Sequence, residues 1–200
     1  MDKILFLNAL TALIVIIDPI GTALIFNALT QGVDAKSRAF TACKAIIISM
    51  FLLVVFGMYG QDLLEKLGIS IEALRISGGL LLFYTAFHMV ARRLDYSAPS
   101  GEGDISVFPM SVPLIAGPGT LTMAVLLFSG ASHSGSEVSV IVAVLTVGMI
   151  TFVALILAAS VKRLIGKTGD EVLRRFLGVL LAALAIQFIM DGVDVFFNPS

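Results

Sequence analysis

The sequence predicts an all-α membrane protein in which six transmembrane helices form two inverted three-helix repeats, with the first and fourth helices broken mid-membrane. Three observations predict this fold. The composition is strongly apolar, six long apolar segments alternate with short polar connectors, and two similar interruptions by proline and glycine recur 98 residues apart, at Gly21 and Gly119.

The amino-acid composition indicates whether the surface of the protein faces water or lipid. Hydrophobic residues make up 58% of the chain and charged residues 14%, and the mean hydropathy is +1.03. Soluble proteins have about 45–50% apolar and about 25% charged residues. A 200-residue soluble domain cannot hide this excess in its core, so the partner must be the lipid bilayer. A net charge of −1 without a basic run excludes nucleic acid as a partner. The single cysteine, Cys43, forms no internal disulfide, and no metal-ligand spacing or cofactor motif is present.

The apolar segments have the length of membrane-spanning helices. A helix needs about 20 residues to cross the hydrocarbon layer of about 30 Å. The candidate spans are residues 4–29, 39–60, 73–91, 107–130, 138–161 and 175–197. Between them, residues 92–106 include a glycine- and serine-containing stretch that is typical of a linker. The domain organisation is therefore a first repeat at 1–91, a cytoplasmic linker at 92–106, and a second repeat at 107–200.

Basic residues indicate the orientation, because short cytoplasmic loops are enriched in lysine and arginine. The connectors after spans one, three and five, with their flanks, hold ten of the 13 basic residues: Lys36, Arg38, Lys44, Arg92, Arg93, Lys162, Arg163, Lys167, Arg174 and Arg175. We therefore expect a bacterial-type inner (plasma) membrane protein with odd-numbered loops in the cytoplasm and both termini outside. An alternative is a signal peptide that runs from Lys3 to Asp18, but apolar sequence resumes at Ala23 and favours a span.

Two landmarks indicate an internal duplication. The pair Gly21-Thr22 recurs as Gly119-Thr120, at an offset of 98 residues. At an offset of 100, four residues of span three match four of span six: Arg75, Gly78, Leu80 and Leu81 match Arg175, Gly178, Leu180 and Leu181. A unit of three spans must be inverted in its second copy, and inverted repeats are typical of secondary transporters that work by alternating access.

The first interruption reads Asp18-Pro19-Ile20-Gly21-Thr22. Proline disfavours helical geometry in the residue before it, and glycine permits backbone angles that other residues avoid. Asp18 has two interpretations. A carboxyl at membrane depth is costly unless it is paired, solvated or protonated, so Asp18 would carry a proton or bind sodium. Alternatively, its carboxylate caps backbone N–H groups that the break exposes.

The second interruption contains Gly117-Pro118-Gly119-Thr120, and we expect Thr120 to cap the helix that follows. Irregular backbone at membrane depth must face protein or a water-filled cavity. The N–H groups of the resumed helices would suit a carboxylate, and unwound carbonyls would suit an ammonium group or a coupling cation. Together they fit a small zwitterionic solute. The alternative is a pair of merely kinked helices, since proline and glycine are frequent in membrane spans.

Two further polar residues are weaker candidates. Gln187 and Asp191 are four residues apart and share one face of the last span, where they either line an outward vestibule or are simply hydrated. Five glycines are expected to allow close contact between helices: Gly57, Gly60, Gly78, Gly79 and Gly178.

At these motifs the chain resembles the MarC family of integral membrane proteins, which is also grouped with six-span neutral amino acid transporters. The motifs that carry the resemblance are residues 18–22, 112–120 and 178–181 through 187–192, and the resemblance covers essentially the whole length of the chain. The resemblance implies a transporter of glycine- or alanine-like amino acids, driven by a proton or sodium gradient, whose pocket Gly21, Thr22, Gly119 and Thr120 would bound. Many relatives have Asn in place of Asp18, which leaves the coupling ion open.

The leading functional hypothesis is therefore a secondary transporter of small neutral amino acids. A small-solute or ion channel of the same architecture is the alternative, although rings of charge or repeated carbonyl-lining sequence would then be expected. An enzyme is not expected, because no nucleophile or metal-binding motif places a base beside a reactive group. A purely structural role would not explain why two helices are interrupted at the cost of backbone hydrogen bonds. The sequence leaves the oligomeric state open.

Overall fold

Every secondary-structure element in the described part of the chain is a helix. A computed structural model describes residues 2–30, 32–91, 104–131 and 136–197. The elements are α1 (Lys3–Ile17), α2 (Pro19–Leu29), α3 (Ala35–Lys66), α4 (Ile71–Ala91), the π-helical segment η1 (Ser106–Ile115), α5 (Pro118–Ser129), α6 (Ser136–Ile156) and α7 (Ala158–Phe197).

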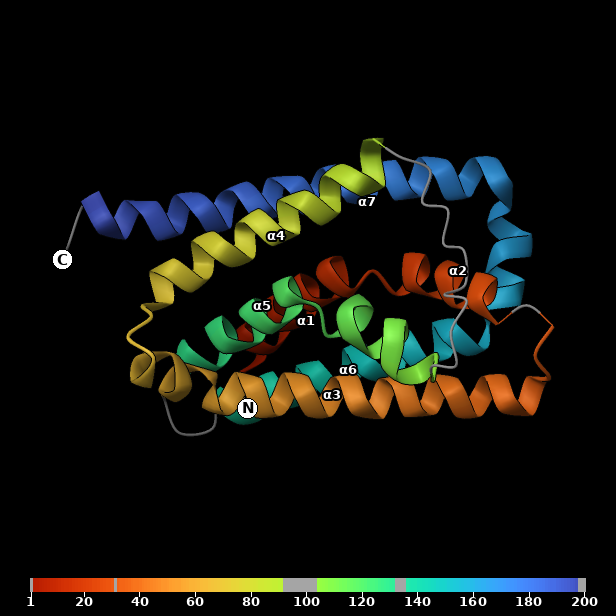
Figure 1. The fold of residues 1–200 in the computed structure, drawn as a ribbon, viewed down its shortest axis with the longest axis horizontal. Coiled ribbons are helices and arrows are strands. Elements are labelled where there is room, and N and C mark those ends of the chain that lie inside the picture. Colours follow the sequence, from red (N-terminus) through yellow and green to blue (C-terminus); the bar gives the residue numbers. More distant parts are fainter. Residues whose placement is uncertain (1, 31, 92–103, 132–135, 198–200) are drawn as a thin grey trace.

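The helices form three layers (Figure 1). On one side α4 and α7 lie side by side, and on the other α3 packs against α6. Between these pairs lie α1, α2, η1 and α5: α2 packs on α6 and α7, α5 packs on α3 and α4, and η1 packs on α3. The segments that contain the two interruptions are therefore central in the molecule.

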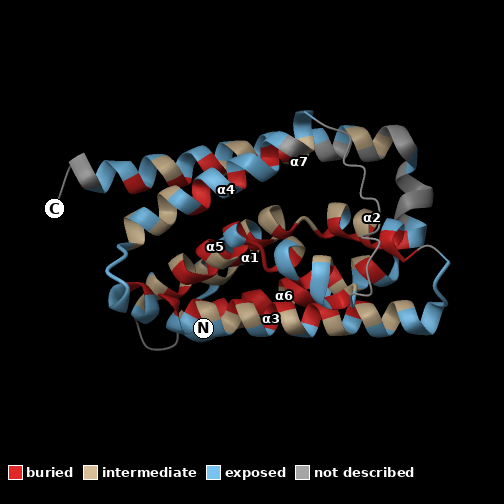
Figure 2. Ribbon diagram, viewed as in Figure 1, coloured by how far each residue is buried: buried red, intermediate tan, exposed pale blue. Residues whose placement is uncertain are grey.

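Burial follows the same layers (Figure 2). Buried side chains such as Leu13, Phe26 and Val144 gather where the middle layer meets its neighbours. The outward faces of α3 and α4 are nevertheless apolar: Phe51 is 65% exposed and Tyr84 64%. Large apolar side chains on an outward face are unfavourable in water and suit lipid.

The lengths and hydropathy of the helices account for the spans. Five segments are long and apolar enough to cross a membrane: Lys3–Leu29, Ala35–Lys66, Ile71–Ala91, Ser136–Ile156 and Arg175–Val195. The pair of η1 and α5, bent by 58°, makes a sixth if it is counted as one span. The chain is a helical membrane protein with multiple spans.

Several predicted boundaries were wrong. The predicted connector 162–174 lies within α7, where one residue, Gly166, interrupts the helix with φ 66°. Only glycine adopts such an angle easily, so a glycine permits the change of direction at this point. The fifth span ends at Ile156, and α3 extends to Lys66, beyond its predicted end at residue 60. Of the predicted linker 92–106, residues 92–103 lie outside the described part of the chain.

Helices α4 and α7 come into close contact at two glycines, one on each helix, and each glycine faces a backbone carbonyl of the other helix. A Cβ atom on Gly79 would lie 2.7 Å from the carbonyl oxygen of Ala185, and one on Gly178 would lie 3.3 Å from that of Ala86. The other neighbours also correspond. Gly79 faces Phe188 and Ile189, whereas Gly178 faces Met89 and Val90.

All these pairs are related by a shift of 99 residues, from 79 to 178, 86 to 185, 89 to 188 and 90 to 189. The sequence matches had suggested a shift of 100 for this helix. The five glycines predicted to allow close helix contact do so, each facing atoms of another helix.

Candidate functional site

The first interruption of the middle layer, called the first bend below, is a single residue, Asp18, between α1 and α2; Lys3–Leu29 still forms one span across it, whereas η1 and α5 are bent by 58°. Asp18 has φ 46° and ψ 74°, the left-handed region, and it is the one described residue other than glycine with a positive φ. The following Pro19 explains this geometry, because proline excludes the helical conformation from the residue before it and then fits the first position of a new helix. The interruption therefore falls at Asp18, within the stretch Asp18-Pro19-Ile20-Gly21-Thr22 that the sequence predicts.

Asp18 ends one helix and begins the next. Its N–H donates to the carbonyl of Ile14 at 3.0 Å, which closes α1. Its carboxylate atom Oδ1 accepts the N–H of Gly21 at 3.0 Å, which caps α2. The capping role that the sequence allowed for Asp18 is present in the structure. A role as ion carrier stays a prediction.

Gly21 and Thr22 complete the first bend. A Cβ on Gly21 would lie 2.1 Å from Oδ2 of Asp18, so any other side chain at this position would displace the capping carboxylate. The hydroxyl of Thr22 donates to the carbonyl of Ile17 at 2.7 Å, which satisfies a carbonyl at the end of α1. Pro19 and Thr22 are buried, whereas Ile20 is 38% exposed. The threonine is therefore a structural part of the bend.

The second bend joins η1 to α5 at Ala116-Gly117. Within η1, Phe108 and Val112 have extended backbone, as expected for residues that precede prolines, and both X–Pro bonds are cis. Helix α5 starts at Pro118 with Gly117 as its N-cap, and no side chain caps it. The expectation that Thr120 is the N-cap was wrong, because Pro118 already fits the first helical position and Thr120 falls within the first turn.

Glycines at the second bend also permit close contacts. A Cβ on Gly117 would lie 2.3 Å from the carbonyl oxygen of Pro113. A Cβ on Gly119 would lie 2.2 Å from Cδ2 of Leu82, a buried side chain of α4. One turn further, Gly78 of α4 faces the side chain of Thr122. Helix α4 therefore covers the first turn of α5.

The two bends lie in neighbouring segments. Helix α1 packs against α5, and α2 packs against η1. The predicted residues of the first bend are therefore grouped around Asp18. The predicted residues of the second bend are grouped at the start of α5. The two groups belong to adjoining elements of the middle layer.

Gln187 and Asp191 are placed elsewhere. Both are exposed on α7, and the amide Nε2 of Gln187 donates to Oδ1 of Asp191 at 2.5 Å. The residues of α7 that face inward are different ones, such as Leu181, Ala185 and Phe188. That Gln187 and Asp191 line an outward vestibule stays a prediction.

An ion pair fixes the start of η1 to α3. The carboxylate of Asp104 accepts hydrogen bonds from Lys44 Nζ and from the backbone N–H and hydroxyl of Ser106. These donors lower the pKa of Asp104 from its ordinary value of 3.8 to about 2, the Lys44 hydrogen bond being the largest cause. Sequence reasoning missed this pair, since nothing in the spacing of residues 44 and 104 indicates contact.

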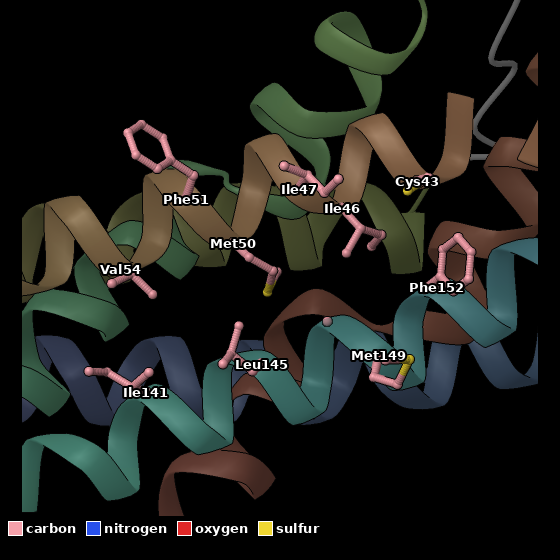
Figure 3. A pocket seen from close by; sticks show the side chains of 11 residues that line it. Cys43, Ile46, Ile47, Met50, Phe51, Val54, Ile141, Leu145, Met149 and Phe152 are labelled. Carbon is pink, nitrogen blue, oxygen red and sulfur yellow. The ribbon is translucent and has the colours of Figure 1, made fainter. Parts of the chain in front are cut away.

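Two cavities among the described residues are lined by residues other than those of the two bends. The larger, about 760 Å³, lies between α3 and α6 and is lined from Cys43 to Val54 and from Ile141 to Phe152 (Figure 3). Its walls are apolar, so it offers no partner to a zwitterion, whose burial without hydrogen bonds is costly. A smaller cavity of about 210 Å³ is polar and includes Gln61, Asp62 and Glu137. Among the described residues, no group of three His, Cys, Asp or Glu could hold a metal ion.

Comparisons with known proteins place this architecture in a family. The family model described as "MarC family integral membrane protein" matches residues 4–197. The chain is 33% identical to a UPF0056 membrane protein of Methanocaldococcus jannaschii, over 96% of this chain and 98% of the relative.

Bacterial relatives are similar. The UPF0056 membrane protein YvbG of Bacillus subtilis is 32% identical, over 93% of this chain and 92% of its own. The UPF0056 inner membrane protein YhgN of Escherichia coli is 30% identical, over 96% and 98%. No solved structure matches. The resemblance read from the two interrupted motifs is thereby confirmed, and the chain belongs to the MarC family of integral membrane proteins.

Proposed function

We propose that this chain is a secondary transporter that moves small neutral amino acids, such as glycine and alanine, across the inner membrane by alternating access, coupled to H⁺ or Na⁺. The observation that carries the proposal is the reciprocal packing of the two halves around a bent middle layer.

The most extensive helix contacts are preserved when the halves are exchanged, whereas the smaller contacts of α1 with α7, α5 with α6 and α6 with α7 have no counterpart of similar extent. Exchange relates α1 and α2 to η1 and α5, α3 to α6, and α4 to α7. When the halves are exchanged, the contact of α2 with α7 becomes the contact of α5 with α4. In the same way, the contact of α1 with α6 becomes the contact of η1 with α3. All four contacts are present. The contacts of α4 with α7, and of α3 with α6, map onto themselves.

Such reciprocity supports an inverted repeat, because three spans per half require the second copy to run in the opposite sense. Two halves of this kind can exchange conformations. Each conformation would open the central site to one side of the membrane. The glycine contacts of Gly79 and Gly178, related by 99 residues, support the same relationship at the level of single residues.

The chemistry of the bends suits a zwitterion. Asp18 supplies a carboxylate, which favours an ammonium group or a cation nearby. Helix α5 begins without a side-chain cap, so its first turn presents peptide N–H groups and the positive end of a helix dipole. A small amino acid carries both complementary charges on adjacent atoms. The proposed binding residues are therefore the two bend sequences, 18–22 and 117–120.

Membrane location and orientation belong to the same proposal. The excess of lysine and arginine in the odd-numbered connectors supports cytoplasmic placement of these loops, with both termini outside. The Escherichia coli relative is named an inner membrane protein. The apolar outward faces of α3 and α4 would contact lipid.

The test is solute counterflow in proteoliposomes made with the purified chain. Vesicles loaded with unlabelled alanine should accumulate labelled glycine and alanine with saturation, and an imposed H⁺ or Na⁺ gradient should change the rate. Empty vesicles and vesicles with Gly119→Leu, which blocks the second bend, are the controls. Absence of saturable flux for any small zwitterion would refute the proposal. Unitary ion conductance in planar bilayers would favour the channel instead.

A further inference from the structure

We infer that the apolar cavity between α3 and α6 is a binding groove for a membrane phospholipid, which lays one acyl chain along the groove and places its phosphate at the Lys36 end of α3. This inference goes beyond the proposed function, because no residue of either bend lines the groove. Its occupation can also be measured without transport.

The cavity is a groove that opens away from the bundle. Its floor lies where α3 and α6 touch: Met50 and Gly148 are buried, and a Cβ on Gly148 would lie 2.5 Å from Sδ of Met50. Its rims are Ile47 on α3 and Leu145 and Met149 on α6, and all three are more than half exposed. Figure 3 shows Met50 and Leu145 pointing across the cavity toward each other's helix.

The lining favours a hydrocarbon occupant. Apart from Gly148 and the thiol of Cys43, every lining side chain is aliphatic, aromatic or a methionine. Water or a polar molecule would lose hydrogen bonds there, and an empty space of about 760 Å³ would forfeit dispersion contacts. A hydrocarbon chain supplies these contacts and needs no hydrogen bond. Met50 and Met149 are flexible side chains that can adapt to its shape.

The length of the groove matches one leaflet of the bilayer. The lining on α3 runs from Cys43 to Val54, which at 1.5 Å per residue is roughly 16 Å. Half of the hydrocarbon layer is about 15 Å thick. Both α3 and α6 are long and apolar enough to cross the membrane, so the groove runs along the direction of the acyl chains. One chain from the leaflet at the N-terminal end of α3 therefore fills it.

A lysine lies beyond one end of the groove. Residues 36, 43 and 50 are seven apart, about two helical turns, and share one face of α3. Lys36 is exposed on this face, roughly 10 Å along the axis from Cys43. The polar layer of a bilayer is about 5–8 Å thick on each side, so the ammonium group of Lys36 lies within reach of a lipid phosphate.

The charges at the two ends differ in sign. Near Lys36 the acidic residue of the first turn is Asp34, whose carboxylate caps α3 by accepting the N–H of Ser37 at 3.0 Å. Beyond the other end, Glu137 lies one turn before the lining residue Ile141 on α6 and would repel a phosphate. The electrostatics therefore favour a headgroup at the Lys36 end.

A second copy of the chain fits the groove less well. Helices in membranes pack on one another through small residues, as α4 and α7 do at Gly79 and Gly178. The rims of the groove carry large side chains, which keep another helix away from the floor. A hydrocarbon chain is thin enough to pass between them.

The test uses fluorescence, because the chain contains no tryptophan and a single introduced one reports on its surroundings. Phe152→Trp places the reporter in the lining, and Phe83→Trp places it on the exposed face of α4 as the control. Each protein is titrated in detergent with phosphatidylglycerol whose acyl chains are brominated and quench on contact. Quenching of the Phe152→Trp protein should saturate at a low ratio of lipid to protein. Quenching of the Phe83→Trp protein should rise only with the lipid content of the micelle.

Two substitutions in the Phe152→Trp protein test the groove and the phosphate site. Leu145→Phe narrows the groove and should raise the lipid concentration for half-maximal quenching about fivefold or more. Leu80→Phe, at a similarly exposed position of α4, should not. Lys36→Gln should raise this concentration roughly fivefold through loss of one charge near the lipid surface. Lys66→Gln, at the other end of α3, is its control.

A chemical test uses Cys43, the single thiol of the chain, which is exposed at one end of the groove. Reaction of the Phe152→Trp protein with N-dodecylmaleimide attaches a hydrocarbon chain that competes for the groove, so the saturable quenching should be lost. Reaction with N-ethylmaleimide blocks the same thiol without a chain and should leave the quenching in place.

Three results would overturn the inference. Unsaturable quenching of equal extent in both tryptophan proteins would show that lipid only surrounds the chain. Saturable quenching that neither Leu145→Phe nor the dodecyl adduct changes would place the lipid elsewhere. Extensive oxidative cross-linking of Cys43 between two copies in native membranes would assign the groove to a protein contact. An effect of Leu145→Phe without one of Lys36→Gln would overturn the position of the phosphate. Amino acid flux is measured separately, so the proposed function stands or fails independently.

Discussion

Gly79 of α4 lies directly against the backbone of Ala185 of α7, so that a methyl group on the glycine would come within 2.7 Å of the carbonyl oxygen. A shift of 99 residues turns this contact into that of Gly178 with the carbonyl of Ala86. Close backbone approach between helices is how membrane proteins gain packing energy, because lipid removes the hydrophobic driving force between spans.

The first prediction concerns this helix pair. Gly79→Ala and Gly178→Ala should each destabilise the protein by about 1–3 kcal/mol, because the opposing atoms include backbone that cannot rotate away. The expected fall in the midpoint of thermal unfolding in detergent is about 2–10 °C. Leu80→Ala, on the exposed face of α4, is the matched control and should change the midpoint little. Equal stability of the parent and both glycine variants would contradict the packing.

The second prediction concerns the first bend. Gly21→Ala should cost about 1–3 kcal/mol, because its Cβ would collide with the Asp18 carboxylate. Asp18→Gly removes that carboxylate and still adopts the positive φ of 46°. In the Asp18→Gly background the cost of Gly21→Ala should therefore fall by about 0.5–3 kcal/mol, as a double-mutant cycle measures. Additive effects would show that the two residues do not interact.

The third prediction separates capping from coupling. Asp18→Asn keeps an N-cap acceptor of similar strength, whereas Asp18→Ala loses it at about 1 kcal/mol. Unfolding midpoints should therefore be close to the parent for Asn and lower for Ala. If Asp18 carries the coupling ion, Asp18→Asn should fold normally and lose the response of alanine flux to the driving gradient. An intact gradient response in Asp18→Asn would assign Asp18 to capping alone.

The fourth prediction is a dependence of stability on pH. The pKa of Asp104 is depressed from 3.8 to about 2 in the folded protein, so the ionised carboxylate favours folding above pH 3.8. This contribution is lost as the pH falls from about 4 toward 2. It should amount to about 1 kcal/mol or less, because the two side chains are 42% and 45% exposed and solvent screens the pair.

Asp104→Asn and Lys44→Gln test this contribution. Each should reduce the loss of the unfolding midpoint between pH 5 and pH 3 relative to the parent. The parallel variant Asp62→Asn, on the exposed end of α3, should behave like the parent. A slope in Asp104→Asn as steep as that of the parent would rule out the ion pair as its source.

Local chemistry accounts for what could be predicted. The span regions follow from apolar length, and both interruptions follow from Asp18-Pro19 and Gly117-Pro118, because proline acts on its own neighbours. The first interruption falls at Asp18, within the predicted stretch 18–22, because proline acts on the residue before it. The predicted cap of the helix after the second interruption was wrong. Thr120 resembled an N-cap by type, but Pro118 began the helix earlier.

The contacts that could not be predicted are those between residues far apart in the sequence. Leu82 is one of three consecutive leucines, and the sequence contains no sign that this one covers Gly119. The pairing of Lys44 with Asp104 is similarly invisible at a separation of 60 residues. The offset of 99 residues that relates the contact of Gly79 with Ala185 to that of Gly178 with Ala86 became clear only from which glycine faces which carbonyl.

The sequence by itself determined that the chain is a membrane protein, which regions contain its spans and where proline and glycine interrupt two of them, because hydropathy and backbone preference act over a few neighbouring residues. The ends of the helices were predicted less well. Tertiary structure alone decided that the interrupted segments form the middle layer, that Asp18 fills the space beside one glycine, and that Leu82 fills the space beside its counterpart. The physical reason is that packing selects partners by shape across the bundle, and shape complementarity between distant helices leaves no local pattern in the chain.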